Sequence, residues 1–341
     1  MSFPVFDGHN DLLLNLWLHY ADAPAATFFN GVPRGHLDFP RMQQGVFAGG
    51  LFAIFVPPLS YVEKMAPTRV AQAQDGLTIM WQQLAILQQI EAASEGRAKI
   101  CRSAQEIAAC RATGVLAMVA HIEGADAFDA EGEALAAFYA AGVRSIGPFW
   151  NLPNRFGEGV TGGFPGSPDS GPGLTAQGEA LIAQANALHM LIDVSHMNEK
   201  AFRDTARLSR APLVASHSNV HARCPQPRNL THAQLCTIAD SQGVVGLNFG
   251  NAFLRPDGKR DADTPLAEMV HHLTHLIRVM GEDHVALGSD FDGITPPAAL
   301  GDVSGLPRLF AALAQAGYTD HQIEKIAWGN WQRVLRAIWG A

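Results

Sequence analysis

The sequence predicts an α/β protein built as a (β/α)8, TIM-like barrel. Short apolar, β-branched runs alternate along the chain with longer Ala- and Leu-rich segments of helical spacing. Near-continuous apolar strands indicate a parallel sheet covered on both faces, and eight strand–helix units are what such a barrel requires. The first run ends in Asp7-Gly8-His9-Asn10-Asp11, which lacks the glycine-rich turn typical of a doubly wound nucleotide-binding fold.

Each barrel strand is predicted from an apolar run, and most of the helices lie between these runs. The predicted strands are Pro4–Gly8, Gly50–Val56, Val115–Ile122, Val143–Phe149, Met190–Ser195, Pro212–Ser216, Val244–Phe249 and Val285–Ser289. The clearest helices are Arg69–Ala93, Glu131–Ala141, Thr175–Leu188, Glu199–Leu208, His232–Ser241 and Pro265–Met280, and two more, near Leu306–Ala316 and Asp320–Trp339, close the chain. Thr175 and Thr319 are predicted N-caps, and only Thr319 is followed by the Gln that completes a capping box.

The length of 341 residues would allow two domains, but a barrel of this length is commonly one. We therefore expect a single domain over residues 1–341. The segment 151–172 is rich in Gly and Pro and is predicted to be an extended loop over one face of the barrel.

Composition excludes several classes of protein. The formal net charge is −8, and no cluster of Lys and Arg predicts a nucleic-acid partner. The uncharged segment 45–61 is interrupted by Gly and Pro, so no membrane span is expected. Met1–Pro4 lacks the pattern of a signal peptide, which favours a cytoplasmic location without an anchor. The 4 cysteines are then expected to be reduced thiols.

Polar residues stand at the ends of five predicted strands. In a (β/α)8 barrel these carboxyl ends meet at one face, where the active site lies. The residues are His9, Asp11, Glu123, His196, His217 and Asp290. Any one of them alone is more often a helix cap or a satisfied polar group, but imidazoles and carboxylates gathered at one face favour zinc or a similar divalent metal.

The number of these residues suggests two metals. One ion needs three or four ligands and would leave some unused, whereas two ions sharing a bridging carboxylate would use them all. Glu123 is the best bridge because a carboxylate has two oxygens. A hydroxide between the ions would be the nucleophile of a hydrolysis, and Asp290 would carry the proton to the leaving group.

Short motifs are spread over almost the whole chain. They are Asp7-Gly8-His9-Asn10-Asp11, His36-Leu37-Asp38-Phe39-Pro40-Arg41, Ile122-Glu123-Gly124, Asp193-Val194-Ser195-His196, Ser216-His217-Ser218, Arg228-Asn229-Leu230 and Ser289-Asp290-Phe291-Asp292-Gly293. These motifs resemble those of the membrane (renal-type) dipeptidases, peptidase family M19, and stand in the order that the family has them. The chain looks like a soluble, bacterial-type member. The resemblance implies a metal-dependent hydrolase barrel that acts as a homodimer on dipeptides, including those with a D-residue at the carboxyl side.

The resemblance also implies roles for individual residues. Two zinc ions would be held by His9 and Asp11 on one side and by His196 and His217 on the other, with Glu123 as bridge and Asp290 as catalytic acid/base. Arg228 would hold the substrate carboxylate with two parallel hydrogen bonds.

The sequence departs from the family after the fourth strand, where Trp150 stands in place of a histidine that contacts the scissile carbonyl region. An indole donates one hydrogen bond but carries no positive charge. Trp150 and Asn151 are therefore candidate substrate-binding residues, and Asn151, Asn154 or Arg155 could replace the histidine.

Two other functions stay open. A binuclear barrel could cleave another small amide, an N-acyl amino acid or an ester, although the pair His9-x-Asp11 and the presence of Arg228 favour a peptide with a free carboxylate. A barrel that keeps its metals without turnover is the second alternative, and the presence of Asp290 argues against it.

Overall fold

The computed structural model describes residues 3–129 and 133–340, and it is an α/β fold with parallel strands. The strands are β1 (Val5–Asn10), β2 (Phe47–Phe55), β3 (Ala98–Ile100), β4 (Leu116–Glu123), β5 (Ser145–Gly147), β6 (Leu191–Ile192), β7 (Val214–Ala215), β8 (Val244–Leu247) and β9 (Val285–Leu287). Every predicted strand is present. Sequence analysis missed β3 because it is only three residues long and has a charged lysine at its centre.

The strands form two parallel sheets. The first has the order β1-β2-β4-β5-β6, with β3 paired to β4, and the second has the order β7-β8-β9. Isolated parallel bridges join the two sheets, one between Asp193 and Val214 and one between Asn10 and Phe291. Because all pairs are parallel, the carboxyl ends of the strands point to one face of the curled sheet.

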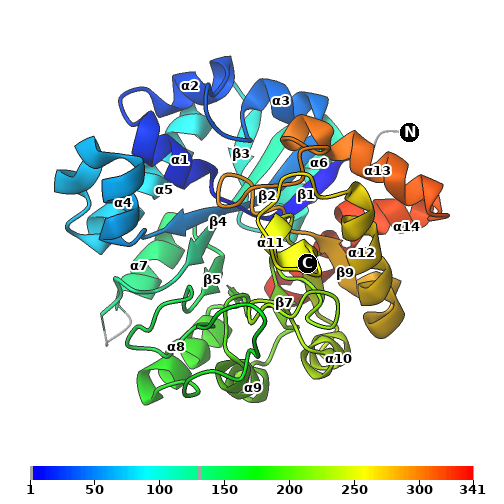
Figure 1. Ribbon diagram of the computed structural model, residues 1–341. Coiled ribbons are helices and arrows are strands. Elements are labelled where there is room, and N and C mark those ends of the chain that lie inside the picture. Colours follow the sequence, from blue (N-terminus) through cyan, green and yellow to red (C-terminus); the bar gives the residue numbers. More distant parts are fainter. Residues whose placement is uncertain (1–2, 130–132, 341) are drawn as a thin grey trace.

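Helices surround the strands in the view of Figure 1. They are α1 (Leu12–His19), α2 (Pro24–Asn30), α3 (Phe39–Gln44), α4 (Leu59–Met65), α5 (Gly76–Ala93), α6 (Ala104–Thr113), α7 (Glu133–Ala141), α8 (Ala176–Ala187), α9 (Glu199–Leu208), α10 (His232–Asp240), α11 (Asn251–Leu254), α12 (Leu266–Met280), α13 (Leu306–Gln315), α14 (Asp320–Glu324) and α15 (Asn330–Trp339). No helix among the described residues is both long and apolar enough to cross a bilayer.

Two predicted helices are interrupted in the structure. The region predicted as Arg69–Ala93 is a 3₁₀ turn, Pro67–Gln72, followed by α5, whose start is fixed by the Asp75 carboxylate on the backbone N–H groups of Leu77 and Thr78. Asp320–Trp339 contains a π-helical turn between α14 and α15. The predicted start at Glu131, and the predictions about Met1, Ser2 and Ala341, lie outside the described residues.

Both predicted N-caps are confirmed. The Thr175 hydroxyl accepts a hydrogen bond of 3.0 Å from the backbone N–H of Gly178 at the start of α8. Thr319 and Gln322 form the reciprocal capping box at the start of α14. The four cysteines are free, as expected, and the Cys101 and Cys110 sulfurs lie 3.6 Å apart.

A separate apolar cluster fills the space inside the strands. It joins strand side chains such as Phe6, Leu51 and Val244 to Trp331 on α15. The Trp331 indole N–H donates a 2.9 Å hydrogen bond to the backbone carbonyl of Leu287. A Cβ at Gly8 would collide with the Trp331 ring and the Ser216 carbonyl, so only glycine fits there. The C-terminal helix therefore packs into the core beneath the strands.

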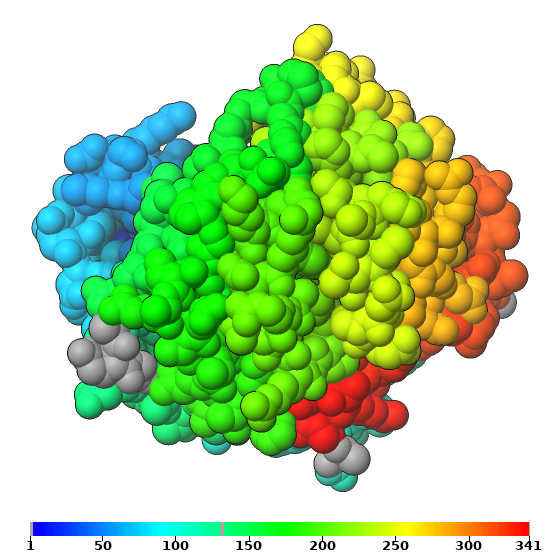
Figure 2. Space-filling model, turned by 90° about the horizontal axis from the view of Figure 1, so that it is seen from below, coloured from blue at the N-terminus to red at the C-terminus, as the bar shows by residue number. Residues whose placement is uncertain are grey.

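The segment 151–172 lies between β5 and α8 and contains no helix or named strand. The Asn198 side-chain amide fixes it by donating to the carbonyls of Glu158 and Pro172, at 2.9 and 2.8 Å. A Cβ at Gly258 would meet the Phe164 ring, so the tip of this segment packs on the loop after α11. Figure 2 shows the green segment rising beside the yellow one at the upper edge of the molecule.

One buried amide links α5 to the end of β2. The Gln83 side chain accepts a 2.9 Å hydrogen bond from the Phe55 N–H and donates one of 2.7 Å to the Phe55 carbonyl.

We expect Gln83→Ala to lower the free energy of unfolding by about 1–3 kcal/mol, because both Phe55 groups lose their partner. Urea denaturation measures this. Gln88→Ala, an exposed position on the same helix, should stay within about 0.5 kcal/mol of the parent, and equal losses would contradict the assignment.

Candidate metal centre

The structure brings all six predicted strand-end residues together at the carboxyl face. His9 lies within β1, Glu123 is the last residue of β4, and His196, His217 and Asp290 follow β6, β7 and β9. All six side chains, Asp11 included, are buried. His196 and Asp290 have positive φ, at 66° and 59°. Such strain in residues other than glycine is typical of functional positions.

Two groups of potential ligands share Glu123. In the first, His9 Nε2 lies 3.5 Å from Glu123 Oε2 and 3.8 Å from Asp11 Oδ2. In the second, Glu123 Oε1 lies 3.0 Å from His196 Nε2 and 3.5 Å from His217 Nε2. The two Glu123 oxygens thus face different histidines, which is the arrangement that a bridging carboxylate needs.

Several polar atoms of the cluster are better suited to bind metal ions than to bond to one another. Among the described residues, neither ring nitrogen of buried His9 has a hydrogen-bond partner. The Nε2 atoms of His196 and His217 converge to 2.9 Å, both aimed at the same carboxylate oxygen. Buried polar atoms without partners are costly, and imidazole nitrogens with carboxylates are ligands that divalent metals accept. Residues of this chain could therefore hold two ions, one in each group.

The three histidines differ in their pKa shifts. Burial works to lower the pKa of His9, but the Glu123 and Asp11 carboxylates raise it well above its usual range. Burial, and then Arg228, lower the pKa of His196 to about 4, and burial and His9 lower the pKa of His217 well below its usual range. Both rings are thus neutral at pH 7, which is the metal-binding form. Burial works to raise the pKa of Glu123, but His9 and the hydrogen bonds from the histidines hold it well below its usual range.

Asp290 lies in the same cluster with a different environment. Burial and the neighbouring Asp11 carboxylate raise the pKa of Asp290 well above its usual range. The Asn248 amide donates a 2.7 Å hydrogen bond to Asp290 Oδ2. One oxygen is therefore held, and the raised pKa favours the protonated carboxyl more than in a free aspartate, which suits a group that holds a proton.

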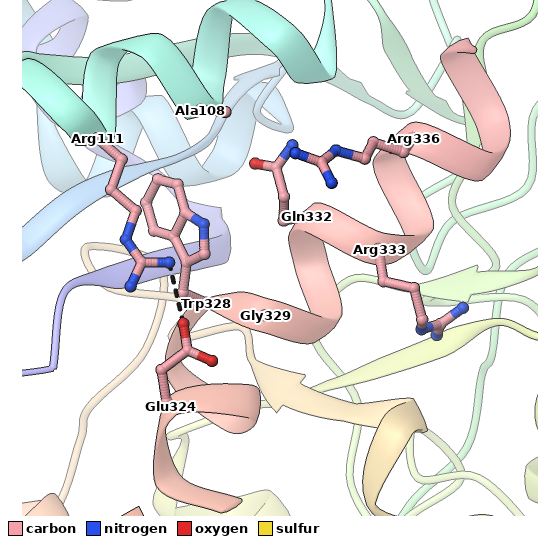
Figure 3. Close-up of a pocket in the computed structure, with 8 residues that line it drawn as sticks. All are labelled: Ala108, Arg111, Glu324, Trp328, Gly329, Gln332, Arg333 and Arg336. Atoms are coloured by element: carbon pink, nitrogen blue, oxygen red, sulfur yellow. Dashed lines mark hydrogen bonds and ion pairs between the residues drawn. The ribbon is translucent and has the colours of Figure 1, made fainter. Parts of the chain in front are cut away.

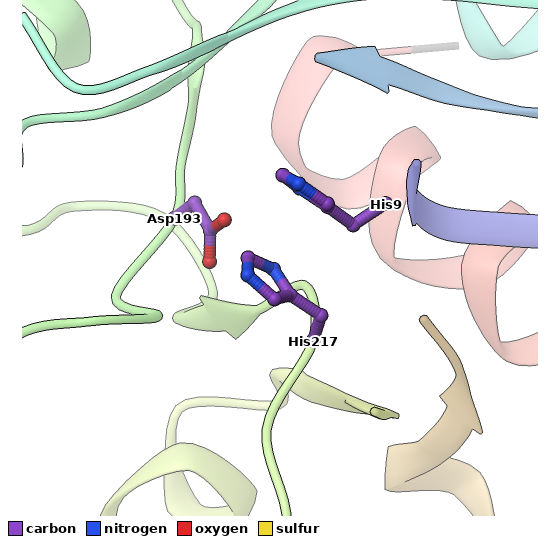
Figure 4. A group of neighbouring side chains, drawn as sticks. All are labelled: His9, Asp193 and His217. Carbon is purple, nitrogen blue, oxygen red and sulfur yellow. The ribbon is translucent and has the colours of Figure 1, made fainter. Parts of the chain in front are cut away.

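A second set of side chains orients His217. The Ser216 hydroxyl lies 2.7 Å from His217 Nδ1 and also bonds to the Asp193 carboxylate. Figure 4 shows Asp193 beside the rings of His9 and His217, which stack at 3.8 Å between centroids. Hydrogen bonds of this kind fix which nitrogen of a ligand histidine carries the proton. Asp193 holds Ser216 and so orients His217.

Sequence analysis assigned no role to three residues of this site. Asp193 and Asp292 belong to the quoted motifs, and Asn248 lies at the end of the predicted strand Val244–Phe249. A search for every polar residue at a strand end would have found Asn248. Asp292 bonds to the His36 backbone and side chain, so it ties the loop after β9 to that before α3. Burial raises the pKa of Asp292 to about 7.

Asn151 and Arg228 both contact His196 Nδ1. Asn151 Oδ1 lies 2.8 Å away and Arg228 Nε 3.1 Å away. The two contacts require opposite tautomers of His196. The Asn151 oxygen can only accept, so it needs a proton on Nδ1, whereas the Arg228 guanidinium can only donate, so it needs a lone pair on Nδ1. Metal binding through Nε2 requires the proton on Nδ1, so it favours the bond to Asn151.

The Arg228 guanidinium is buried against the histidine loops. It donates to the Ser218 hydroxyl at 2.6 Å and to the His217 carbonyl at 2.7 Å. Counting the His196 contact, three of its five N–H groups have partners, and a proton on His196 Nδ1 would free the Nε–H as well, so at least two are left for a ligand. Its carboxylate-binding role stays a prediction.

The cluster opens into a cavity of about 790 Å³ at the carboxyl face. Asp11, Glu123, His196 and Asp290 form part of its wall, together with Trp150 and Asn151. The Trp150 ring packs 5.4 Å from the Phe55 ring and 6.2 Å from the His196 ring, measured between centroids. The indole thus forms an aromatic wall beside the His196 ring, and the substrate-binding roles of Trp150 and Asn151 stay predictions.

A smaller pocket of about 430 Å³ lies between α6 and α15, away from this cluster. Figure 3 shows Arg111 reaching from α6 to Glu324, with which it makes a 3.0 Å ion pair. Arg111 also lies 4.8 Å from the Trp328 ring centroid, and Arg333 donates to the backbone carbonyls of Gln242, Gly243 and Asp283. Most of its charged groups are therefore satisfied by the protein itself.

Comparison with known proteins agrees with the geometry. The model of the membrane dipeptidase family (peptidase family M19) matches residues 1–339. A Rhodobacter sphaeroides metallo peptidase, solved with a phosphinate mimic of the dipeptide L-Ala-D-Ala, has a TM-score of 0.94 and 45% identity over 99% of this chain and 100% of its own. The solved "dipeptidase AC" gives 0.94 and 47% over the full length of both chains.

A relative without a known activity is more similar in sequence. The "Uncharacterized protein in pqqA 5'region" of Klebsiella pneumoniae is 66% identical over 265 residues, which are 78% of this chain and 98% of that protein. The family match spans nearly the whole chain and includes every residue of the buried cluster. This chain therefore belongs to the membrane dipeptidase family, peptidase family M19, and is a metallopeptidase.

Proposed function

We propose that the protein hydrolyses dipeptides at a centre of two zinc ions. His9 and Asp11 would bind one ion, His196 and His217 the other, and Glu123 both. The observation that carries this proposal is the Glu123 carboxylate, whose Oε2 faces His9 and whose Oε1 faces His196 and His217. When bound, the two ions supply a strongly polarising centre that activates water and stabilises the developing oxyanion.

Residues of the chain supply proton transfer. Asp290 stands beside Asp11 in the cluster, and Asn248 holds its Oδ2. We assign Oδ1 the task of accepting the proton of the attacking water and returning it to the leaving amine. The raised pKa of Asp290, caused by burial and by Asp11, favours holding that proton between the two steps.

The substrate would be gripped at its two charged ends. Its amino group would lie near the carboxylates of the cluster and its carboxylate near the free N–H groups of Arg228, with Trp150 and Asn151 beside the peptide. The dipeptide mimic bound by the Rhodobacter sphaeroides relative has a D-residue at its carboxyl side, which supports acceptance of L-Xaa-D-Xaa substrates.

We further propose that the strands form a closed (β/α)8 barrel within a single domain. The parallel bridges at both junctions between the sheets support closure, since a continuous pairing there would complete a ring of eight strands with β3 outside it. The homodimer and the cytoplasmic location expected from the sequence stay predictions.

Metal removal tests the centre. Dialysis against a chelator should abolish dipeptide hydrolysis, and titration with zinc should restore it in full at two ions per chain, measured by elemental analysis. Glu123→Gln should bind fewer than two, because an amide is a poor bridge. Full activity at one ion per chain would contradict the binuclear proposal.

Substitution of the proton carrier tests the mechanism. Asp290→Asn should lower kcat by about 10²–10⁴-fold, since an amide cannot accept and return the proton, while two zinc ions remain bound. Asp261→Asn, at an exposed position outside the cluster, serves as the control and should keep parent kcat. An active Asp290→Asn enzyme would assign the proton to another group.

A substrate panel tests the two-ended grip. L-Ala-D-Ala and L-Ala-L-Ala should release free amino acids, and amidation of the substrate carboxylate should lower kcat/KM at least about tenfold, as loss of a charge-assisted bidentate pair does. Arg228→Lys keeps the charge but loses the planar fork, so the penalty for amidation should shrink. Equal rates for the free and amidated dipeptides would overturn the role of Arg228.

A further inference from the structure

The cavity has two parts of opposite charge. Its inner wall carries the carboxylates of Asp11, Glu123, Asp290 and Asp292. Three cationic side chains of the same cavity form what we term the cationic rim: Arg34, Lys64 and Arg260. All three residues are exposed, which places them toward its opening. Within residues 3–129 and 133–340, none of the three side chains makes an ion pair or hydrogen bond.

Carboxylate partners for cations are plentiful in this chain. Its net charge is −8, so carboxylates outnumber cations. Elsewhere Arg41, Arg111, Arg207 and Arg255 each lie within 3.0 Å of a carboxylate oxygen. The rim residues keep their charge available for a ligand, and they come from three separate segments of the chain.

The backbone beneath Arg34 is firmly fixed. The Arg34 backbone N–H donates a 3.0 Å hydrogen bond to the Tyr20 hydroxyl, and the Arg34 carbonyl accepts one of 2.9 Å from the Asn15 side-chain amide. Asn15 also contacts Asp292 at 3.4 Å. Arg34 is thereby tied to the loop that follows the catalytic Asp290.

Lys64 lies on α4 one turn after Tyr61, and both line the cavity, so they share a helix face. Burial and then Asp11 raise the pKa of Tyr61, and Arg34 opposes that rise. Tyr61 and the rim residues line the same cavity as Asp11, so a ligand in that cavity can meet both parts.

The size of the cavity leaves room for such a ligand. A volume of about 790 Å³ lies in the upper part of the range of roughly 300–1,000 Å³ that holds drug-sized ligands. A dipeptide backbone held at the buried cluster would occupy only the inner part. A side chain extending outward would meet the rim.

We propose that Arg34, Lys64 and Arg260 form a subsite for a carboxylate side chain, so that dipeptides containing Asp or Glu are preferred substrates. This inference rests on the proposed dipeptidase function. Guanidinium and ammonium groups recognise a carboxylate by charge and hydrogen bonding, whereas an amide of the same shape gains only the neutral hydrogen bonds.

Isosteric pairs isolate this charge. We would measure kcat and KM for L-Ala-D-Asp against L-Ala-D-Asn, and for L-Asp-D-Ala against L-Asn-D-Ala, all with free termini. The acid should be preferred at least about tenfold in kcat/KM in one pair, mainly through KM, and the preference should shrink in 0.5 M salt because the rim is exposed to solvent. The salt arm separates charge recognition from shape.

Variants assign the preference to the rim. Arg34→Gln, Lys64→Met and Arg260→Gln should each reduce the acid-to-amide ratio of kcat/KM, and the triple variant should bring it near one. Lys259→Met is the matched control, since Lys259 is exposed and adjacent to Arg260 but does not line the cavity, and its ratio should equal that of the parent.

The outcomes separate the two proposals. If dipeptides are hydrolysed but acid and amide agree within twofold in both pairs, the subsite is overturned and the dipeptidase function stands. If the triple variant keeps the parent's acid-to-amide ratio of kcat/KM, the subsite is also overturned, because another group then binds the side-chain carboxylate. If no dipeptide is turned over by zinc-loaded protein, the proposed function fails and the subsite falls with it.

Discussion

The contact between the Glu123 carboxylate and three histidines is the interaction on which the site depends. Burying a carboxylate costs several kcal/mol unless partners compensate for the lost water. His9 on one oxygen, and His196 and His217 on the other, provide that compensation. Glu123 ends β4, which pairs with both β2 and β5, so its position is fixed from both sides. Histidines from three separate strand ends are thus held around one rigid carboxylate.

The packing of the strands explains why His196 and Asp290 keep a strained backbone conformation and still have defined positions. The parallel pairing brings the strand ends together, and Trp331 of α15 packs among the strands against Gly8. A well-packed interior over-determines the loops above it, so positive φ at His196 and Asp290 persists. Hydrogen bonds with Ser216, Asn151 and Asn248 then set the orientation of His217, His196 and Asp290.

The two parts of the cavity carry opposite charge and therefore suit different ligands. The inner carboxylates suit metal ions and a substrate amine, and the cationic rim suits an anion. Arg228 is buried against the histidine loops, with at least two N–H groups unused. A small zwitterionic substrate would find complementary charge at each end, which fixes its direction in the cavity.

The sequence by itself determined eight of the nine strands and the six residues of the cluster, because buried parallel strands are continuous apolar runs and because polar site residues collect at their carboxyl ends. It also determined the caps at Thr175 and Thr319, which are local. Tertiary structure alone decided the pairing of β3, the contacts of Asn151 and Arg228 with His196, and the meeting of Arg34, Lys64 and Arg260 around one opening. These join residues distant in the chain, and no local pattern of propensity or periodicity encodes which distant side chains will meet.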